Sequence, residues 1–228
     1  MQHFPSLEDQ TAKIAVETSP AVRSGGWYVT YFKRVLDLSI VIFTLPFTLP
    51  IIFSFWMLVR RDGGPGFFGH LRVGRDGKTF KCWKLRSMHV KAEERLEELL
   101  RTDTAAVKEW AESQKLSNDP RVTKMGALLR KSSIDELPQI WNVLVGEMSI
   151  VGPRPVTYAE LRRYGSRDWA YLSVLPGITG QWQVSGRNSI GYEQRVSLDV
   201  EYRKTISLSN DLIIFIRTFR EVLRRTGC

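Results

Sequence analysis

The longest apolar stretch of the chain runs from residue 35 to residue 59 and reads VLDLSIVIFTLPFTLPIIFSFWMLV. Asp37, near its start, is the only charged side chain within it. As an α-helix with a rise of about 1.5 Å per residue, this stretch is long enough to cross the ~30 Å hydrocarbon core of a bilayer. The pattern therefore predicts a helix embedded in a membrane.

The charges at the two ends of this stretch favour a helix that enters and leaves the membrane on the same side. Lys33 and Arg34 precede the stretch, and Arg60 and Arg61 follow it. Lysine and arginine beside a membrane segment favour the cytoplasmic side, whereas a spanning helix would place one of these pairs outside. A simple transmembrane span is the alternative interpretation.

Pro46 and Pro50 lie in the middle of the stretch and predict that the helix bends or breaks there. Proline has no backbone N–H, and its ring clashes with the carbonyl four residues earlier. Two halves of about 18 Å each would reach roughly halfway into the bilayer and return. We expect the hydroxyls of Thr44 and Thr48 to bond the carbonyls that the prolines leave free.

Shorter patterns downstream predict a small β-hairpin and amphipathic helices. Weak alternation places strands near 67–73 and 79–86, joined at an Asp-Gly turn. Residues 91–116 are highly charged with a narrow apolar stripe, which predicts one helix or two. Near the C-terminus, Ser209 is the expected N-cap of a helix through residue 225. Its apolar stripe flanked by arginines fits a helix lying on an anionic bilayer, and a core-packing helix fits the same pattern.

The charge balance indicates an anionic partner. The chain has 33 Lys and Arg against 24 Asp and Glu, a net charge of +9. Nucleic acid, phospholipid headgroups and phosphorylated substrates all fit this balance. The basic excess between residues 60 and 91 can hold lipid headgroups, substrate phosphates or both. Cys82 and Cys228 lie far apart in the sequence, and neither has the spacing of a metal ligand. We therefore expect no disulfide framework and no zinc site, which fits a reducing cytoplasm.

Residues 127–155, ALLRKSSIDELPQIWNVLVGEMSIVGPRP, contain the adjacent carboxylates Asp135 and Glu136. Ser133 and Glu136 have the spacing of a capping box, which begins a helix. Acidic residues in a first helical turn are common because they complement the helix dipole. Spacing alone therefore favours a structural role for this acidic pair.

The residues around the acidic pair favour a chemical role as well. Arg130 and Lys131 precede it, and glycine-flanked polar turns follow at 152–155, 177–180 and 185–188. Glycine permits close backbone approach, and arginine binds phosphate oxygens through two parallel hydrogen bonds. Adjacent carboxylates among such arginines make chemical sense if one attacks phosphorus and the other holds a divalent cation.

Taken together, these residues resemble the bacterial sugar transferase family, the monotopic polyprenyl-phosphate phosphoglycosyl transferases. The resemblance extends from about Tyr31 to Gly227, and its stretches are specific together and in this order. These stretches are FKRVLD at 32–37, GKTFKCWKLRSM at 77–88, NDPRVTKMGALLRKSSIDELPQIWNVLVGEMSIVGPRPV at 118–156, PGITGQWQVSGRN at 176–188 and LDVEYRKTISLSNDL at 198–212.

The resemblance implies a two-step transfer. Asp135 would attack the β-phosphate of a UDP-sugar, release UMP and carry the sugar phosphate until undecaprenyl phosphate accepts it. Glu136, together with Asp135, would hold Mg²⁺. We expect a nearby cation and the helix dipole to favour the ionised form of Asp135. The side chains expected to bind phosphates or the nucleotide, with lipid headgroup contact as the alternative, are Arg130, Arg154, Arg187, Lys84 and Arg86.

The resemblance also sets expectations for substrate, location and partners. The charged stretch at 91–116 followed by NDPRVT is similar to short members that initiate exopolysaccharides, which favours galactose 1-phosphate, with glucose 1-phosphate as the alternative. The expected partners are a UDP-sugar, undecaprenyl phosphate and phospholipid at the cytoplasmic face of the bacterial inner membrane, without nucleic acid. The oligomeric state stays open, with a homodimer as one expectation. A non-catalytic membrane scaffold for glycan assembly is the other function considered, and the intact acidic pair argues against it.

Together these patterns predict an α+β fold that is mainly helical. It combines a re-entrant membrane helix hairpin, a small β-hairpin and interfacial amphipathic helices. Residues 1–30 lack the basic-then-apolar pattern of a secretion signal. Their mixed composition, with two prolines and a Gly-Gly pair, predicts a disordered tail. Residues 31–62 are the expected re-entrant membrane helix, and residues 63–228 the expected cytoplasmic catalytic domain.

Overall fold

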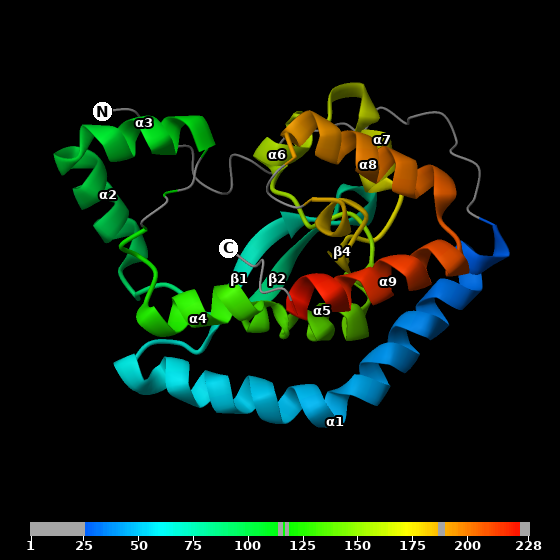
Figure 1. The fold of residues 1–228 in the computed structure, drawn as a ribbon, viewed down its shortest axis with the longest axis horizontal. Helices are drawn as coiled ribbons and strands as arrows, with labels where there is room; N and C mark the ends of the chain where they lie inside the picture. The colour runs from blue at the N-terminus through cyan, green and yellow to red at the C-terminus, as the bar shows by residue number, and fades with distance from the viewer. Residues whose placement is uncertain (1–25, 114–115, 117–118, 187–189, 224–228) are drawn as a thin grey trace.

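The computed structural model describes residues 26–113, 116, 119–186 and 190–223, so most of the expected tail lies outside the described residues. The helices are α1 (Lys33–Val59), α2 (Ala92–Thr102), α3 (Thr104–Ser113), α4 (Lys124–Ser132), α5 (Gln139–Val145), α6 (Tyr158–Arg162), α7 (Asp168–Leu172), α8 (Tyr192–Thr205) and α9 (Leu208–Leu223). The strands are β1 (Phe67–Val73), β2 (Thr79–Leu85), β3 (Ser149–Val151) and β4 (Gly177–Thr179). The described residues thus form the predicted, mainly helical α+β fold, with α1 along one side (Figure 1).

α1 is one continuous helix through Pro46 and Pro50, and Figure 1 shows it bent near its middle. A bend is the expected effect of prolines inside a helix. The prediction for the threonines is wrong, because Thr44 and Thr48 bond the carbonyls of residues 40 and 44. A helical threonine hydroxyl reaches the carbonyls three or four residues earlier, whereas the prolines release those of residues 42 and 46.

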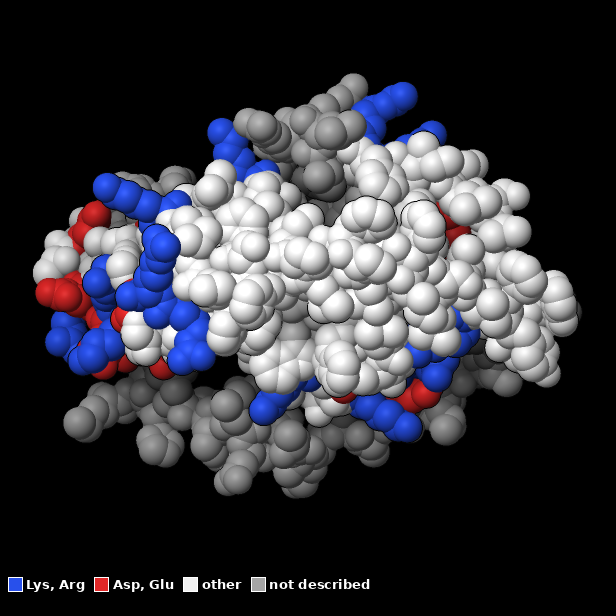
Figure 2. Space-filling view, turned by 90° about the horizontal axis from the view of Figure 1, so that it is seen from below, with Lys and Arg blue, Asp and Glu red and all other residues white. Residues whose placement is uncertain are grey.

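One side of α1 packs on the rest of the protein, and the other side is exposed. The helical segment Tyr28–Asp62 is long and apolar enough to cross a membrane, and its π-helical first turn begins before the predicted boundary at residue 31. Val41, Ile52 and Val59 are buried. The exposed large apolar side chains are Val35, Ile42, Phe43, Phe47, Leu49, Ile51, Phe53 and Met57. Figure 2 shows a broad uncharged band on the underside of the molecule, bordered by lysine and arginine.

Buried polar side chains bond the first turns of α1 to the rest of the protein. Asp37 accepts a hydrogen bond of 3.0 Å from the backbone N–H of Ile150 in β3. Lys33 forms an ion pair of 2.5 Å with the buried carboxylate of Asp211 in α9. Arg34 donates to two carbonyls in the last turn of α5, where the helix dipole favours a cation. This basic pair, predicted as a membrane flank, is therefore bonded within the protein.

β1 and β2 form the predicted antiparallel hairpin, with Phe67 opposite Leu85 and Val73 opposite Thr79. The turn falls at the predicted Asp-Gly pair, and both residues have left-handed conformations, with φ values of 58° and 74°. Aspartate and glycine adopt this conformation more readily than other residues, so the local sequence specifies the turn. β2 ends one residue earlier than predicted and places Lys84 near the end of the hairpin away from the turn.

β3 and β4 pair in parallel at the centre of the fold, with Ser149 opposite Gly177. Strands of this length carry no readable periodicity and were not predicted. Gly152 follows β3 and packs directly on the backbone of β4, since a Cβ at Gly177 would lie 2.1 Å from the backbone nitrogen of Gly152. Glycine was expected to permit close backbone approach in these turns, and here the approach is between the backbones of β4 and the residue after β3.

Two helical predictions are confirmed with changes in detail. The charged stretch folds as two helices, α2 and α3, because Asp103 ends the first and its carboxylate accepts from N–H groups of the second. The N-cap of α9 is Ser207, whose hydroxyl accepts from the N–H of Asn210, so the prediction of Ser209 is wrong. α9 buries Ile214 and exposes its apolar stripe, which comprises Leu212, Ile213, Ile216 and Phe219.

Candidate active site

The acidic pair lies in a 3₁₀ turn, Ile134–Glu136, between α4 and α5. Ser133 ends α4 in a left-handed conformation, with φ 57°, and its side chain makes no capping bond. The predicted capping box is therefore wrong, and Pro138 separates the turn from α5. A left-handed residue with a Cβ costs about 1–2 kcal/mol, and strain of this kind is typical of functional sites.

Lys84 and Arg154 reach Glu136 from different parts of the fold. Lys84, near the end of β2, donates to Glu136 Oε1 at 2.7 Å, and its Nζ lies 3.8 Å from Asp135 Oδ2. Arg154, in the loop after β3, lies 3.1 Å from the same Glu136 oxygen. Three segments that are distant in the sequence thus place four of the predicted site residues together.

The two carboxyl groups have pKa shifts in opposite directions. Burial raises the pKa of Glu136, but Arg154 and Lys84 outweigh it and hold the pKa at about 2. Burial raises the pKa of Asp135 above its usual range; Lys84 only partly offsets this, and the charge of Glu136 adds to it. The direction for Asp135 is opposite to our expectation, because the carboxyl is buried beside a second carboxylate.

Opposed shifts in adjacent carboxyl groups indicate that the two groups have different roles. With a pKa of about 2, Glu136 stays ionised at any physiological pH. The carboxylate of Asp135, with its raised pKa, is the more basic oxygen of the two. In chemical terms, Glu136 is suited to hold cations and Asp135 is suited to form a bond to an electrophile.

Arg130 lies in the last turn of α4, and its Nε donates to Ser87 Oγ at 3.0 Å. Its charge lowers the pKa of Asp135, against the larger effect of burial. α4 reaches Ser87 because residue 126 is glycine: a Cβ there would lie 1.9 Å from the carbonyl oxygen of Ser87. Ser87 was not predicted as a site residue, although it lies in the KLRSM stretch together with Lys84 and Arg86.

Arg86 does not join this cluster. Arg86 is 7% exposed and bonds the carboxylate of Asp62. It also donates to the carbonyls of residues 59, 65 and 88, so all its N–H groups have acceptors. These bonds tie the end of α1 to β2, which favours a structural role over a phosphate contact. Arg187 lies outside the described residues.

The carboxylates of Asp135 and Glu136 are the donors here that fit a magnesium ion. No group of three or more histidine, cysteine or acidic side chains that could hold a metal occurs among the described residues. Mg²⁺ commonly binds through one or two carboxylates together with substrate phosphates, so a dedicated cage of protein ligands is not required. The acidic pair therefore fits magnesium bound together with a diphosphate.

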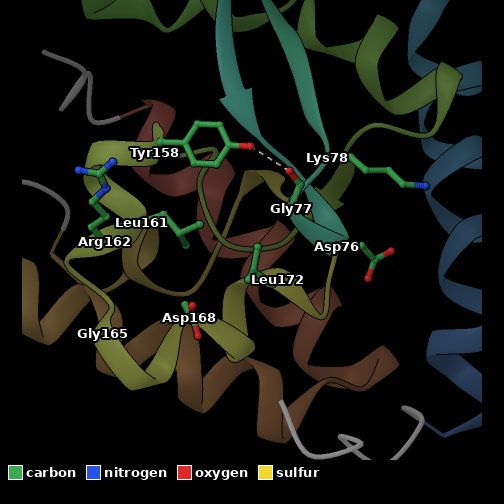
Figure 3. Close-up of a pocket in the computed structure, with 9 residues that line it drawn as sticks. All are labelled: Asp76, Gly77, Lys78, Tyr158, Leu161, Arg162, Gly165, Asp168 and Leu172. Carbon is green, nitrogen blue, oxygen red and sulfur yellow. Dashed lines mark hydrogen bonds between the residues drawn. The ribbon is translucent and has the colours of Figure 1, made fainter. Parts of the chain in front are cut away.

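A separate cavity of about 440 Å³ lies at the turn of the hairpin (Figure 3). Tyr158 extends over it and donates to the carbonyl of Gly77 at 3.2 Å. Lys78 on its rim is about 20 Å from Lys84 along β2, at about 3.3 Å per residue. None of the predicted site residues that the structure describes lines this cavity, whose lining is Asp76, Gly77, Lys78, Tyr158, Leu161, Arg162, Gly165, Asp168 and Leu172.

Comparison with known proteins adds to this geometry. The sequence model of a family described as bacterial sugar transferase matches residues 28–225. A UDP-galactose-lipid carrier transferase of Erwinia amylovora is 52% identical over 197 residues, which cover 86% of this chain and 41% of that protein. An undecaprenyl-phosphate galactose phosphotransferase of Salmonella typhimurium is 49% identical over the same shares of the two chains. The exopolysaccharide production protein ExoY of Rhizobium meliloti is 46% identical, over 86% of this chain and 87% of that protein. The chain thus spans less than half of the first two relatives and most of the third.

Proposed function

Because the chain belongs to the bacterial sugar transferase family, we propose that it transfers a hexose 1-phosphate from a UDP-sugar to undecaprenyl phosphate and thereby initiates exopolysaccharide synthesis. The observation that carries the proposal is the acidic pair, whose two pKa values are shifted apart beside Lys84 and Arg154. A basic carboxylate next to cations fits attack on an anionic diphosphate. Galactose is the proposed sugar because two relatives are named for it, and glucose is the alternative.

The proposed transfer has two displacements at one phosphorus atom. In the first, a carboxylate oxygen of Asp135 bonds to the β-phosphorus of the UDP-sugar, and UMP leaves with the electron pair of the broken P–O bond. The sugar phosphate is then held on Asp135 as an acyl phosphate. In the second, an oxygen of undecaprenyl phosphate bonds to the same phosphorus. The carboxylate of Asp135 leaves, and undecaprenyl diphosphate sugar is formed.

The cations of the site would stabilise the negative charge that both displacements move. Lys84 and Arg154 both contact Glu136 Oε1, and Lys84 also faces Asp135, so a diphosphate bound there meets both cations. Arg130 approaches Asp135 from α4 and is the third positive charge. Fixed charges that face the reacting phosphorus stabilise a transition state without reorganising during the reaction. When bound, Mg²⁺ would add Lewis-acid stabilisation of the diphosphate, with Glu136 and Asp135 as its protein ligands.

Purified protein in detergent should release UMP from a UDP-hexose and form a lipid-linked sugar when undecaprenyl phosphate is present. In a panel of UDP-sugars, we expect UDP-galactose to react at least about tenfold faster than UDP-glucose, since enzymes discriminate by positioned contacts to hydroxyls. The measurement is UMP release together with extraction of the labelled lipid. A preference for UDP-glucose would change the proposed sugar from galactose to glucose and leave the proposed reaction unchanged. No release of UMP from any UDP-hexose would contradict the proposed reaction.

We also propose that α1 enters the bilayer from the cytoplasmic face and returns to it. Both ends of α1 are bonded to the same folded body: Lys33 and Asp37 join it near one end, and Arg86 holds Val59 and Asp62 at the other. A helix with both ends on one body fits entry and exit on one side. The exposed apolar side chains of α1 and α9, together with Trp141 on α5, would lie in the lipid and its interface.

The topology has a direct test with cysteines at the two ends of the membrane segment. Gly26 and Arg61 are both exposed, so each can be replaced by cysteine in a chain with Cys228→Ser, since Cys82 is buried. We expect a membrane-impermeant maleimide to label both positions in inverted vesicles and neither in right-side-out vesicles. Labelling of the two positions from opposite sides would show an ordinary span instead.

A further inference from the structure

The buried side chain of Asn142 contacts β2, which carries Lys84, and Glu147, which precedes β3 and the loop of Arg154. Asn142 itself lies in the helix that follows the acidic pair. Asn142 lies in α5, and its exposed fraction is 0%. We propose that Asn142 is a positioning residue, which sets the placement of Lys84 and Arg154 relative to the acidic pair. The inference rests on the transfer reaction proposed above and adds a residue that the resemblance does not assign.

The amide of Asn142 bonds the free side of β2. Its Oδ1 accepts from the backbone N–H of Trp83 at 3.1 Å, and its Nδ2 donates to the carbonyl of Lys81 at 2.7 Å. β2 pairs with β1 alone in a two-stranded sheet, so these backbone groups would otherwise lack a partner strand. Asn142 thus takes the place of a third strand, directly beside Lys84.

The same side chain bonds the segment that leads to Arg154. Its Nδ2 also donates to Glu147 Oε2 at 2.6 Å. The backbone carbonyl of Asn142 accepts from the N–H groups of Glu147 and Met148, at 2.9 and 3.1 Å. This segment continues into β3 and then into the loop that carries Arg154. α5 itself follows the turn that carries the acidic pair, so one residue connects the three parts of the site.

These contacts require an amide. The position needs one acceptor, for Trp83, and two donors, for Lys81 and Glu147, and the carboxamide of asparagine offers both from one planar group. Aspartate has the same shape, but it would place a carboxylate oxygen against the carbonyl of Lys81 and the carboxylate of Glu147. A fully satisfied buried polar network of this kind rigidifies its surroundings. Lys84 Nζ lies 2.7 Å from Glu136 and 3.8 Å from Asp135, so rigidity of β2 acts on the position of this cation beside the reacting groups.

A purely structural role for Asn142 predicts a different result from a positioning role. If the amide only stabilises the fold, its replacement lowers the folded fraction and leaves the rate per folded molecule unchanged. If it positions the site, the rate per folded molecule falls, because displacements of about 1 Å at reacting groups cost about 100-fold in rate. The two roles therefore separate when activity is normalised to folded protein.

The test uses the chain of residues 1–228 in detergent and measures UMP release per folded enzyme, well below the thermal unfolding midpoint of each variant. We expect Asn142→Asp to lower kcat about 100-fold, with a smaller change in KM for the UDP-sugar. Glu147→Gln alone should stay close to wild type. The double variant should regain at least about tenfold over Asn142→Asp, because the new amide of residue 147 can donate to the carboxylate of residue 142.

The matched control is Tyr192→Phe. The hydroxyl of Tyr192 in α8 donates to the backbone carbonyl of Glu160 in α6 at 2.6 Å, and neither helix carries a residue of the acidic-pair site. Removal of this hydroxyl should lower the unfolding midpoint without changing the rate per folded enzyme. A rate for folded Asn142→Asp near that of wild type, or no recovery in the double variant, would overturn the inference.

Failure of the inference and failure of the proposed function give different results. A wild-type protein that releases no UMP from any UDP-hexose defeats the proposed function, whereas an active wild type with an equally active Asn142→Asp variant defeats only this inference. Should Asn142→Asp give no folded protein, Asn142→Gln decides in its place. Glutamine keeps the amide but displaces it by one methylene, so the rate per folded enzyme should fall at least about tenfold. An unchanged rate would overturn the inference.

Discussion

Replacing Asp135 with asparagine is expected to abolish sugar phosphate transfer, with a loss in kcat on the order of 10⁴-fold or more. The amide has the shape of the carboxylate but cannot serve as the nucleophile that bonds to phosphorus. Its partners Lys84 and Arg154 keep their contacts to Glu136, so the variant should still bind the UDP-sugar. UMP release and binding of labelled UDP-sugar, measured side by side, check both parts.

The same variant should be at least as stable as the wild type near neutral pH. The pKa of Asp135 is higher in the folded protein than in the unfolded chain, so ionising this carboxyl disfavours the fold. The contribution of Asp135 to the free energy of unfolding is fully present below the pKa of the unfolded chain. It falls as the pH rises and is lost above the higher pKa of the folded protein. Asparagine cannot ionise, so the variant does not lose stability as the pH rises. Its unfolding midpoint should therefore match or exceed that of wild type near neutral pH. In acid, where Asp135 is protonated, the two midpoints should be the same. A large drop in the midpoint, or persistent UMP release, would count against the assigned role. Asp76→Asn, at the exposed hairpin turn, is the matched control for both readouts.

Replacing Lys84 with methionine is expected to lower kcat by about 10²–10³-fold and to change its pH dependence. Methionine keeps the apolar stem but removes the cation that contacts Glu136 at 2.7 Å and faces Asp135 at 3.8 Å. Burial already raises the pKa of Asp135, and Lys84 is the largest influence that lowers it. Without this cation the pKa rises further, so the acidic limb of the pH–rate profile should move to higher pH.

Lys84→Arg and Lys81→Met are the controls for this result. Arginine keeps the positive charge and should leave the acidic limb closer to its wild-type position. Lys81 lies on the same strand with an exposed side chain, so its replacement should change neither rate nor profile. An acidic limb that does not move in Lys84→Met would show that this lysine does not control the ionisation of the nucleophile.

Those parts of the fold that depend on local sequence were predicted well. The hairpin follows from an alternating pattern on either side of an Asp-Gly turn, and its strands lie where that pattern placed them. The long apolar helix α1 follows from composition alone, and its bend follows from two prolines. β3 and β4 were not predicted, because their pairing depends on glycines that approach each other only in the folded chain.

For the acidic pair, the residues could be found from the sequence, but their environment could not. The spacing of Ser133 and Glu136 predicted an ordinary helix start. Instead, the backbone of Ser133 is left-handed, and the next α-helix begins only after Pro138, its N-cap. The pKa of Asp135 follows from burial beside Glu136, which no sequence pattern reports.

Two further groups of polar residues were misread or missed for the same reason. Lys33 and Arg34 looked like a membrane flank because their buried partners are far away in the chain. The signal for Asn142 was present as one polar residue inside QIWNVLV, but its partners on β2 became known only from the structure.

The covalent sugar phosphate on Asp135 is the central claim, and its capture tests that claim most directly. Wild-type protein is mixed with labelled UDP-galactose in the absence of undecaprenyl phosphate, digested with trypsin and analysed by mass spectrometry. We predict UMP release that stops near one equivalent of enzyme, with a hexose phosphate on the peptide that begins at Ser132 and contains Asp135. Addition of undecaprenyl phosphate should discharge it. UMP release that requires undecaprenyl phosphate, with no adduct on this peptide, would contradict the two-step account.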